Sequence, residues 1–305
     1  MALSSKATFR TISDLGNLST RFALQLHAVG PVNRPPEEQE HDPVGTATVI
    51  APHLAITCKH VITDYLQRYR VRLEEDADTH TNFALTAFMF MEDGRSAVAF
   101  GIQKMVLCEF TDVAILRLGD APTPAPFDSW LLPRLDLFAP SVGSRIHAVG
   151  YHSATFNGRY GSEGTISITR DVAMSEGEVI EVHPRRRDAR LNFPCFHTDA
   201  RFDGGMSGGP VFNADGALCG IISSNLPPTT DDEAHVSYVA TLAPIAAARI
   251  DFGRALDNRG HEFVLQLMLD GVIATRGHEF VAVSLESNGT TTLRMSTGGA
   301  TWVSA

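Results

Sequence analysis

Cysteine is scarce in this sequence, and its four copies do not form a metal-binding motif. Cys58, Cys108, Cys195 and Cys219 are spread over 305 residues, and no two of them make a CxxC pair. Four cysteines are too few for the disulfide scaffold of a small secreted domain, and structural zinc sites typically use paired cysteines. Because the residues around each cysteine are mostly apolar, we expect buried free thiols in a reducing compartment.

Long apolar runs are also absent. No stretch approaches the roughly 18 consecutive apolar residues of a membrane-spanning helix, and residues 1–24 contain no apolar core of a secretory signal. We therefore expect a cytoplasmic protein with no membrane partner. The alternative is an organelle transit peptide, because these residues are rich in Ser, Thr and Arg and contain Asp14 as their one acid.

An excess of positive charge is missing as well. The 25 Lys and Arg residues against 35 Asp and Glu residues give a net charge of −10. Nucleic-acid binding requires a concentrated basic face that neutralises phosphates, and the one basic cluster, residues 185–187, is short. We therefore expect no nucleic-acid partner. Hydrophobic residues make up 44% of the chain, which is enough for a full core and excludes wholesale disorder.

Short apolar runs separated by turn residues dominate the sequence. Their length and spacing favour an all-β pair of sandwiches or barrels over βαβ units. These runs are residues 21–29, 45–50, 54–58, 69–73, 82–91, 113–118, 145–151, 164–169, 179–183, 210–212, 217–223 and 236–242. Apolar residues at helical spacing predict a helix over residues 243–257, and a short helical turn is predicted after His60.

The segment GGMSGGPVF, residues 204–212, places Ser207 among glycines. A nucleophilic serine needs neighbouring backbone N–H groups that turn toward a developing oxyanion, and glycine adopts the required dihedral angles at little cost. A glycine-rich turn of a β protein has the same composition. This segment alone leaves both interpretations open.

Two further segments favour the catalytic interpretation. His60 follows an apolar strand pair in GTATVIAPHLAITCKHV, and Asp112 lies at the start of an apolar strand in FTDVAILRL, where a carboxylate can be held beside an imidazole. The three residues occur in the order His, Asp, Ser, with gaps of 112 − 60 = 52 and 207 − 112 = 95 residues. This combination predicts a catalytic triad.

With these motifs the chain resembles the trypsin/chymotrypsin superfamily of serine proteases, and most closely its HtrA-type and glutamyl-endopeptidase-like branch. The segment HTDARFDGGMSGGPVF is similar to the HtrA-type pattern in which TDA precedes the serine loop. The resemblance extends from about residue 21 to residue 256. It implies a chymotrypsin-like fold of two six-stranded antiparallel β-barrels, with the active site between them.

The resemblance also implies the role of each residue. Ser207 attacks the peptide carbonyl, His60 accepts its proton, and Asp112 orients His60. The N–H groups of Gly205 and Ser207 form the oxyanion hole. The implied partner is a protein or peptide substrate, and neither a cofactor nor a metal is implied.

The primary specificity pocket is expected between two segments of the second barrel. Its residues are Arg201, Phe202, Ile222, Ser223, Ser224 and Asn225. Phe202 and Ile222 favour a small or medium aliphatic residue before the scissile bond, whereas an inward Arg201 favours an acidic one. We favour the apolar pocket, because an unpaired buried guanidinium is costly.

The expected organisation divides the chain into three parts. They are an N-terminal extension over 1–20, a protease domain over 21–257 with barrels at 21–120 and 134–242 and a helix at 243–257, and a β-rich appendage over 258–305. The proline-rich residues 119–133 are expected to join the barrels. In the appendage RGHEFV occurs twice, at 259–264 and 276–281, which predicts two related strands or hairpins.

Regulation is expected to differ from that of digestive zymogens. These carry an Asp before the serine that pairs with a newly cut N-terminus, whereas this chain has Met206. We therefore expect regulation by a protein partner or by the C-terminal tail. The alternative function is a catalytically latent or inactive protease fold that serves as a binding or scaffold protein.

Overall fold

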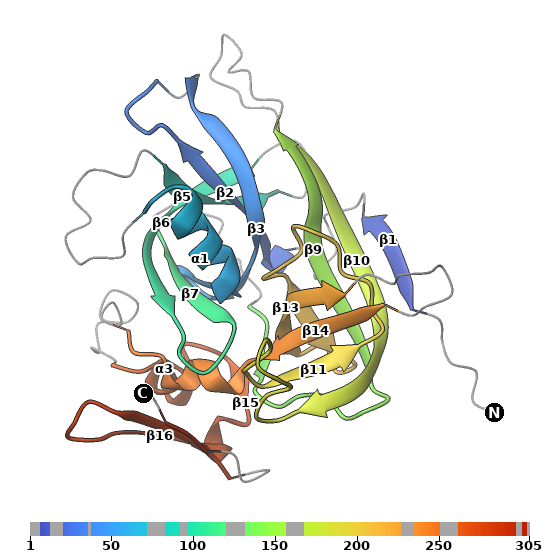
Figure 1. The fold of residues 1–305 in the computed structure, drawn as a ribbon, viewed down its shortest axis with the longest axis vertical. Helices are drawn as coiled ribbons and strands as arrows, with labels where there is room; N and C mark the ends of the chain where they lie inside the picture. Colours follow the sequence, from blue (N-terminus) through green and yellow to red (C-terminus); the bar gives the residue numbers. More distant parts are fainter. Residues whose placement is uncertain are drawn as a thin grey trace.

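Two β-barrels make up most of the structure, and a smaller C-terminal sheet lies beneath them in Figure 1. The computed structural model describes residues 7–12, 21–35, 38–71, 83–91, 97–119, 132–156, 168–226, 235–250, 262–296 and 301–303. The predicted fold class, two six-stranded antiparallel barrels, is confirmed. Within this described part, no helix has the length and apolar character of a membrane span.

The first barrel is closed by six antiparallel strands in the order β2-β3-β4-β7-β6-β5. The strands are β2 (Ala23–Gly30), β3 (Glu40–Ala51), β4 (Leu54–Cys58), β5 (Ala84–Phe90), β6 (Ala97–Leu107) and β7 (Val113–Leu118). After β4 the chain forms α1 (Lys59–Arg68), which confirms the helical turn predicted after His60. Val61, Ile62 and Tyr65 are buried on one face of α1, the spacing that an amphipathic helix requires.

The second barrel is a ring of six strands, β9-β10-β11-β14-β13-β12, that closes where β12 pairs with β9. Its strands are β9 (Arg145–Phe156), β10 (Ile168–His183), β11 (Cys195–Thr198), β12 (Pro210–Asn213), β13 (Leu218–Leu226) and β14 (Val236–Thr241). Two short strands are added to it: β1 (Thr8–Ile12) pairs with β10, and β8 (Leu135–Asp136) runs parallel to β13.

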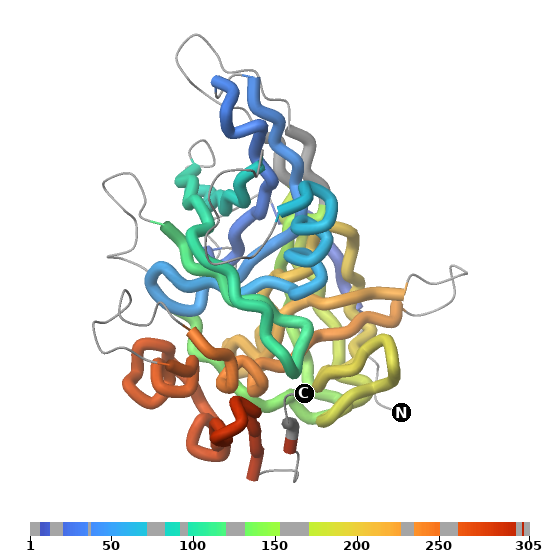
Figure 2. Tube along the Cα trace, turned by 60° about the vertical axis from the view of Figure 1, so that its left-hand side comes forward, coloured from blue at the N-terminus to red at the C-terminus, as the bar shows by residue number. Residues whose placement is uncertain are grey.

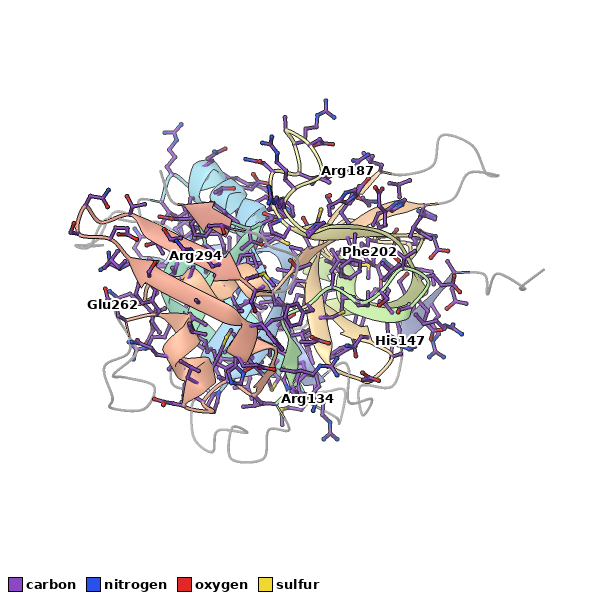
Figure 3. The ribbon with its side chains drawn as sticks, turned by 90° about the horizontal axis from the view of Figure 1, so that it is seen from below. Arg134, His147, Arg187, Phe202, Glu262 and Arg294 are labelled. Carbon is purple, nitrogen blue, oxygen red and sulfur yellow. The ribbon has the colours of Figure 1, made fainter. Side chains whose placement is uncertain are left out.

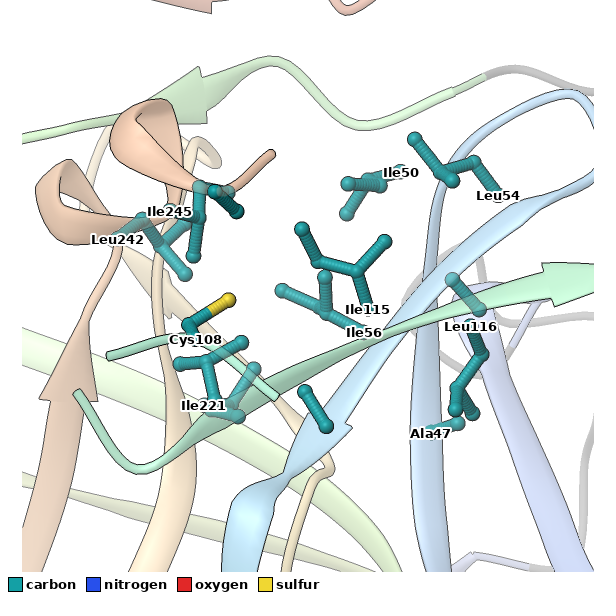
Figure 4. Close-up of a cluster of buried hydrophobic side chains, with 14 of the residues drawn as sticks. Ala47, Ile50, Leu54, Ile56, Cys108, Ile115, Leu116, Ile221, Leu242 and Ile245 are labelled. Atoms are coloured by element: carbon teal, nitrogen blue, oxygen red, sulfur yellow. The ribbon is translucent and has the colours of Figure 1, made fainter. Parts of the chain in front are cut away.

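The two barrels share one buried hydrophobic cluster (Figure 4). Ile56, Cys108 and Ile115 of the first barrel face Ile221 of β13 and Ile245 of the segment that follows β14. Each of these side chains is almost fully buried. Burying one aliphatic side chain contributes about 1.5–3 kcal/mol, so this shared cluster fixes how the barrels sit against each other.

Two local predictions are wrong. The first half of the helix predicted over 243–257 is instead a short 3-10 helix, η4 (Ala243–Ala247), because Ala248 is extended and Arg249 then pairs with Phe263. Residues 69–71 of the strand predicted at 69–73 instead form the turn that follows α1, with Arg70 at φ +55. The rest of both segments, and most of the predicted loops at 119–133 and 225–234, lie outside the described residues.

The C-terminal tail packs along the lower side of the barrels (Figure 2). Its elements are α3 (Val264–Leu269), β15 (Thr275–Arg276), η5 (His278–Phe280) and a three-stranded sheet of β16 (Val281–Leu285), β17 (Thr291–Met295) and β18 (Thr301–Val303). Leu267, Ile273 and Leu293 are buried in the same cluster as the barrels. The tail is therefore continuous with the protein core.

The two RGHEFV copies do not form related strands. The second copy leads into the β16–β17 hairpin, as predicted. The first copy instead starts helix α3, because the Gln266 side chain accepts hydrogen bonds from the N–H groups of Glu262 and Phe263 at 2.6 and 3.0 Å. Its first three residues lie outside the described part of the chain.

Candidate active site

Asp112 holds His60 by both the ring and the backbone. His60 lies in the first turn of α1, and Asp112 directly precedes β7. Its Oδ2 lies 2.8 Å from His60 Nδ1, and its Oδ1 accepts the His60 backbone N–H at 3.0 Å. The residue before the helix, Cys58, makes no side-chain cap, so the Asp112 carboxylate satisfies a first-turn N–H group that would otherwise lack a partner.

The surroundings of His60 raise its pKa. Burial by itself lowers the pKa of the imidazole, but the hydrogen bond to Asp112 and the negative charges of Asp112 and Asp64 outweigh it. The ring is held as an Nδ1–H donor to Asp112, which leaves Nε2 with a free lone pair. His60 can therefore act as a general base above this raised pKa.

Ser223 connects the acid of the first barrel to the serine of the second. The Ser223 hydroxyl donates to Oδ2 of Asp112 at 2.7 Å, and its carbonyl accepts the Ser207 hydroxyl at 3.2 Å. Sequence reasoning assigned Ser223 only to the specificity pocket. Among the described residues, this carbonyl is the hydrogen-bond partner of the Ser207 hydroxyl, and His60 Nε2 is not.

Threonines of the first barrel hold the serine loop, residues 203–209. The Thr46 N–H donates to the Ser207 carbonyl at 2.9 Å, and the Thr46 hydroxyl donates to the Gly205 carbonyl at 2.9 Å. The buried Thr48 hydroxyl donates to the Gly208 carbonyl at 2.8 Å. These contacts across the barrel interface were missed from the sequence, because they join residues about 160 positions apart.

The backbone at Gly205 matches an oxyanion hole. Gly205 has φ +90, a left-handed conformation that favours glycine. A Cβ at this position would lie 2.6 Å from the Tyr151 carbonyl oxygen, so a larger residue is excluded by contact as well. In the part of the chain described here, neither the Gly205 nor the Ser207 N–H group donates a hydrogen bond. Both donors are available to a ligand.

Met206 lies beneath this loop. Its side chain is fully buried, and Sδ accepts the Asp203 N–H at 3.3 Å. The Met206 N–H in turn donates to the Asp203 carbonyl at 3.2 Å. Met206 also packs closely against Gly150, where an added Cβ would lie 2.8 Å from the Met206 Cβ. The loop is therefore ordered by apolar packing, without a buried ion pair at position 206.

Some of the predicted specificity residues are buried in the core, and others lie at the surface. Phe202 and Ile222 are 1% exposed and belong to the core of the second barrel, as Figure 3 shows for Phe202. Arg201 is instead at the surface, where its guanidinium pairs with both oxygens of Asp203 at 2.8 Å. The Asn225 amide donates to the Phe202 carbonyl at 2.6 Å and ties the two segments together. Ser224, the remaining residue, lies next to Ser223 in β13.

Cys58, His60 and Asp112 bring three possible metal ligands within 4.8 Å of one another, but their chemistry does not suit a metal. The Cys58 thiol donates to the Ile222 carbonyl at 2.8 Å. Burial and the nearby Asp112 charge raise its pKa well above the ordinary value. Metals bind the thiolate, and this thiol is held neutral.

A comparison with protein-family models agrees with this architecture. Residues 45–221, more than half of the chain, match the family model described as a trypsin-like peptidase domain. This range contains His60, Asp112 and Ser207. A solved crystal structure of Deg5 is similar over 69% of this chain and 82% of that chain, with 16% sequence identity and a TM-score of 0.44. No match was found among curated proteins.

Proposed function

Because the chain belongs to the family of trypsin-like peptidase domains, we propose that it is a serine endopeptidase that cleaves peptide bonds in protein substrates. The observation that carries this proposal is the grip of Asp112 on His60, in which one carboxylate oxygen binds Nδ1 and the other binds the backbone N–H. This arrangement orients a single ring nitrogen, Nε2, toward proton transfer. A structural histidine needs no such double restraint.

In the proposed reaction His60 acts first as a base and then as an acid. The Ser207 hydroxyl turns from the Ser223 carbonyl toward His60, transfers its proton to Nε2 and attacks the substrate carbonyl. His60 then donates this proton to the leaving amine, which leaves an acyl-enzyme on Ser207. In the second half, His60 accepts a proton from a water molecule that attacks the acyl-enzyme, and then returns it to Ser207 as the acid product leaves. Asp112 stabilises the imidazolium that forms in between.

The N–H groups of Gly205 and Ser207 are proposed to stabilise the negative charge on the substrate oxygen. Both lack partners among the described residues, so they pay no cost in broken protein hydrogen bonds when substrate arrives. Removing one donor of such a hole typically lowers turnover by about 10²–10³-fold. The Thr46 hydroxyl supports the hole by fixing the Gly205 carbonyl on the opposite side of the loop.

The proposed substrate has a small or medium aliphatic residue before the scissile bond. Phe202 and Ile222 lie in the barrel core and offer little surface to a substrate, so the proposal rests on Arg201. Asn225 joins the two pocket segments through the Phe202 carbonyl. Arg201 is engaged by Asp203 at the surface, which argues against an acidic specificity. A library of peptides that differ at this one position tests the proposal, and preferred cleavage after Asp or Glu would contradict it.

The second candidate is a latent protease fold that binds partners. It is favoured by the Ser207 hydroxyl, which donates to the Ser223 carbonyl and not to His60.

We propose that a protein partner acting through the tail, and not zymogen cleavage, controls the site, since Met206 offers no carboxylate for a new N-terminus. The four buried free thiols support a cytoplasmic location.

Labelling with a fluorophosphonate distinguishes the two candidates. This probe reacts with an activated serine without requiring a known substrate. We expect the full chain to be labelled on Ser207. The Ser207→Ala variant should remain unlabelled while keeping the wild-type melting temperature. If the folded wild-type protein is not labelled, the latent function is favoured, and the experiment is then repeated with candidate partners.

A further inference from the structure

The N-terminal strand β1 lies along the outer edge of β10 (Figure 1). Its register pairs Phe9 with Ser175 and Arg10 with Met174. Arg10 is exposed, whereas Phe9 is half-buried and packs against the core cluster of the second barrel that contains Phe202 and Met206. Phe9 therefore connects this strand to the region behind the serine loop.

The Phe9 ring contacts both segments that flank the oxyanion hole. The Arg201 guanidinium lies over its face at 4.4 Å from the ring centroid. The His152 ring meets it edge to face, with centroids 5.6 Å apart. His152 follows Tyr151 in β9, the strand whose backbone lies against Gly205. Phe9 thus lies between the segment that leads into the serine loop and the strand that supports it.

Arg201 passes this contact on to the loop itself. Its guanidinium binds both carboxylate oxygens of Asp203 at 2.8 Å. Asp203 forms two backbone contacts with Met206: its N–H donates to Sδ, and its carbonyl accepts the Met206 N–H. Gly205 lies between these two residues. The position of the Gly205 N–H group therefore depends on where Asp203 is held.

We propose that β1 positions the oxyanion hole, through the chain of contacts from Phe9 to Arg201 to Asp203. This inference rests on the proposed function of the site. Phe9 and Arg201 are positioning residues in it, since neither touches the reacting atoms. They order the loop from the outside of the barrel while Met206 packs beneath it.

The physical basis is the geometry of the guanidinium. An exposed ion pair alone contributes little, because two flexible side chains must be held in one arrangement. Here the planar guanidinium is held on one face by an aromatic ring and at its edge by two hydrogen bonds, so its rotamer is restricted.

The test measures how fast the fluorophosphonate reacts, with its maximal rate (kinact) and its binding constant (KI) determined separately. Phe9→Ala and Arg201→Ala are each expected to lower kinact about 10- to 100-fold, because a small misplacement of a catalytic group costs that much. KI is expected to stay the same. Phe9→Trp, which keeps an aromatic face for Arg201, is expected to retain most of the wild-type kinact.

Two matched controls separate positioning from general weakening of the barrel. Arg10→Ala removes an exposed side chain from the same strand. Arg145→Ala removes an ion pair with Glu176 in the same barrel, and Arg145 is 48% exposed against 45% for Arg201. Both controls are expected to keep the wild-type kinact. Melting temperatures of all variants are measured alongside.

The double variant Phe9→Ala/Arg201→Ala completes the experiment. If both residues act through one contact, its loss of kinact should equal that of the larger single variant and not the product of the two. Unchanged kinact in both single variants, or an equal loss in the controls, would overturn the proposal while wild-type labelling still supports the protease. Absence of wild-type labelling would instead count against the protease function itself.

Discussion

The hydroxyl of Ser223 donates a 2.7 Å hydrogen bond to Oδ2 of Asp112, although the two residues are 111 positions apart and belong to different barrels. The same oxygen accepts from His60 Nδ1. Because the Ser223 carbonyl also accepts the Ser207 hydroxyl, Ser223 joins His60, Asp112 and Ser207 into one network. This network forms only when both barrels are docked.

Ser223→Ala is expected to weaken this network. The variant leaves the buried Asp112 carboxylate with one donor fewer, which costs about 1–3 kcal/mol. We expect a lower free energy of unfolding and slower labelling of Ser207, measured by urea denaturation and by fluorophosphonate kinetics. Ser237→Ala is the control, because the Ser237 hydroxyl is buried without a hydrogen-bond partner among the described residues. Equal behaviour of the two variants would show that the Ser223–Asp112 contact has no role.

The rate of Ser207 labelling is expected to fall as the solution becomes acidic. His60 must be neutral to accept a proton, and its pKa is raised, so the midpoint should lie above the ordinary histidine value of about 6.5. Asp112→Asn removes the charge that raises this pKa and is expected to shift the midpoint downward, with a rate loss of about 10⁴-fold. Asp64→Asn should shift it downward slightly. A midpoint that does not move in Asp112→Asn would contradict the assignment of the base.

The raised pKa of His60 affects the free energy of unfolding in the opposite direction from the labelling rate: it favours the folded state at low pH. The protonated His60 is favoured in the folded state, so its contribution is present below the unfolded pKa. It is lost as the pH rises through the folded pKa.

Two adjacent glycines are expected to respond differently to alanine. Gly205→Ala places a Cβ about 2.6 Å from the Tyr151 carbonyl and forces a residue into φ +90. We expect it to displace one oxyanion donor and to lower the labelling rate by about 10²-fold or more. Gly204→Ala meets no atom within 4 Å and should label at nearly the wild-type rate. Comparable rates in both variants would argue against Gly205 as a donor.

Arg276→Ala is expected to loosen the tail. Arg276 in β15 forms an ion pair with the buried Asp136 of β8, which also accepts the Asn213 amide at 3.0 Å. Loss of one donor to a buried carboxylate should lower the free energy of unfolding by about 1–3 kcal/mol. Arg294→Ala, at an exposed position of β17 (Figure 3), is the control. Identical urea midpoints would show that the Arg276–Asp136 ion pair does not help to hold the tail.

Local contacts explain which elements could be predicted from the sequence. Helix α1 follows from apolar residues at helical spacing, and β4 and β7 begin and end where their apolar runs do. The segment after β14 also has helical spacing, yet its described residues 243–250 form the short helix η4 and then the bridge between Arg249 and Phe263. The conformation of the first RGHEFV copy is likewise set by a residue outside it, because the Gln266 side chain accepts the Phe263 N–H and starts a helix there.

The pattern of apolar runs and the order of the motifs were enough to predict the all-β fold class and to select His60, Asp112 and Ser207, because both are local properties of the chain. How these residues are held depends on packing in three dimensions. The Thr46 and Thr48 anchors, the Ser223 link and the Phe9–Arg201 contact all join residues more than 100 positions apart. No spacing rule encodes such pairs, since they exist only once two barrels, each closed by its own hydrophobic interior, have packed against each other.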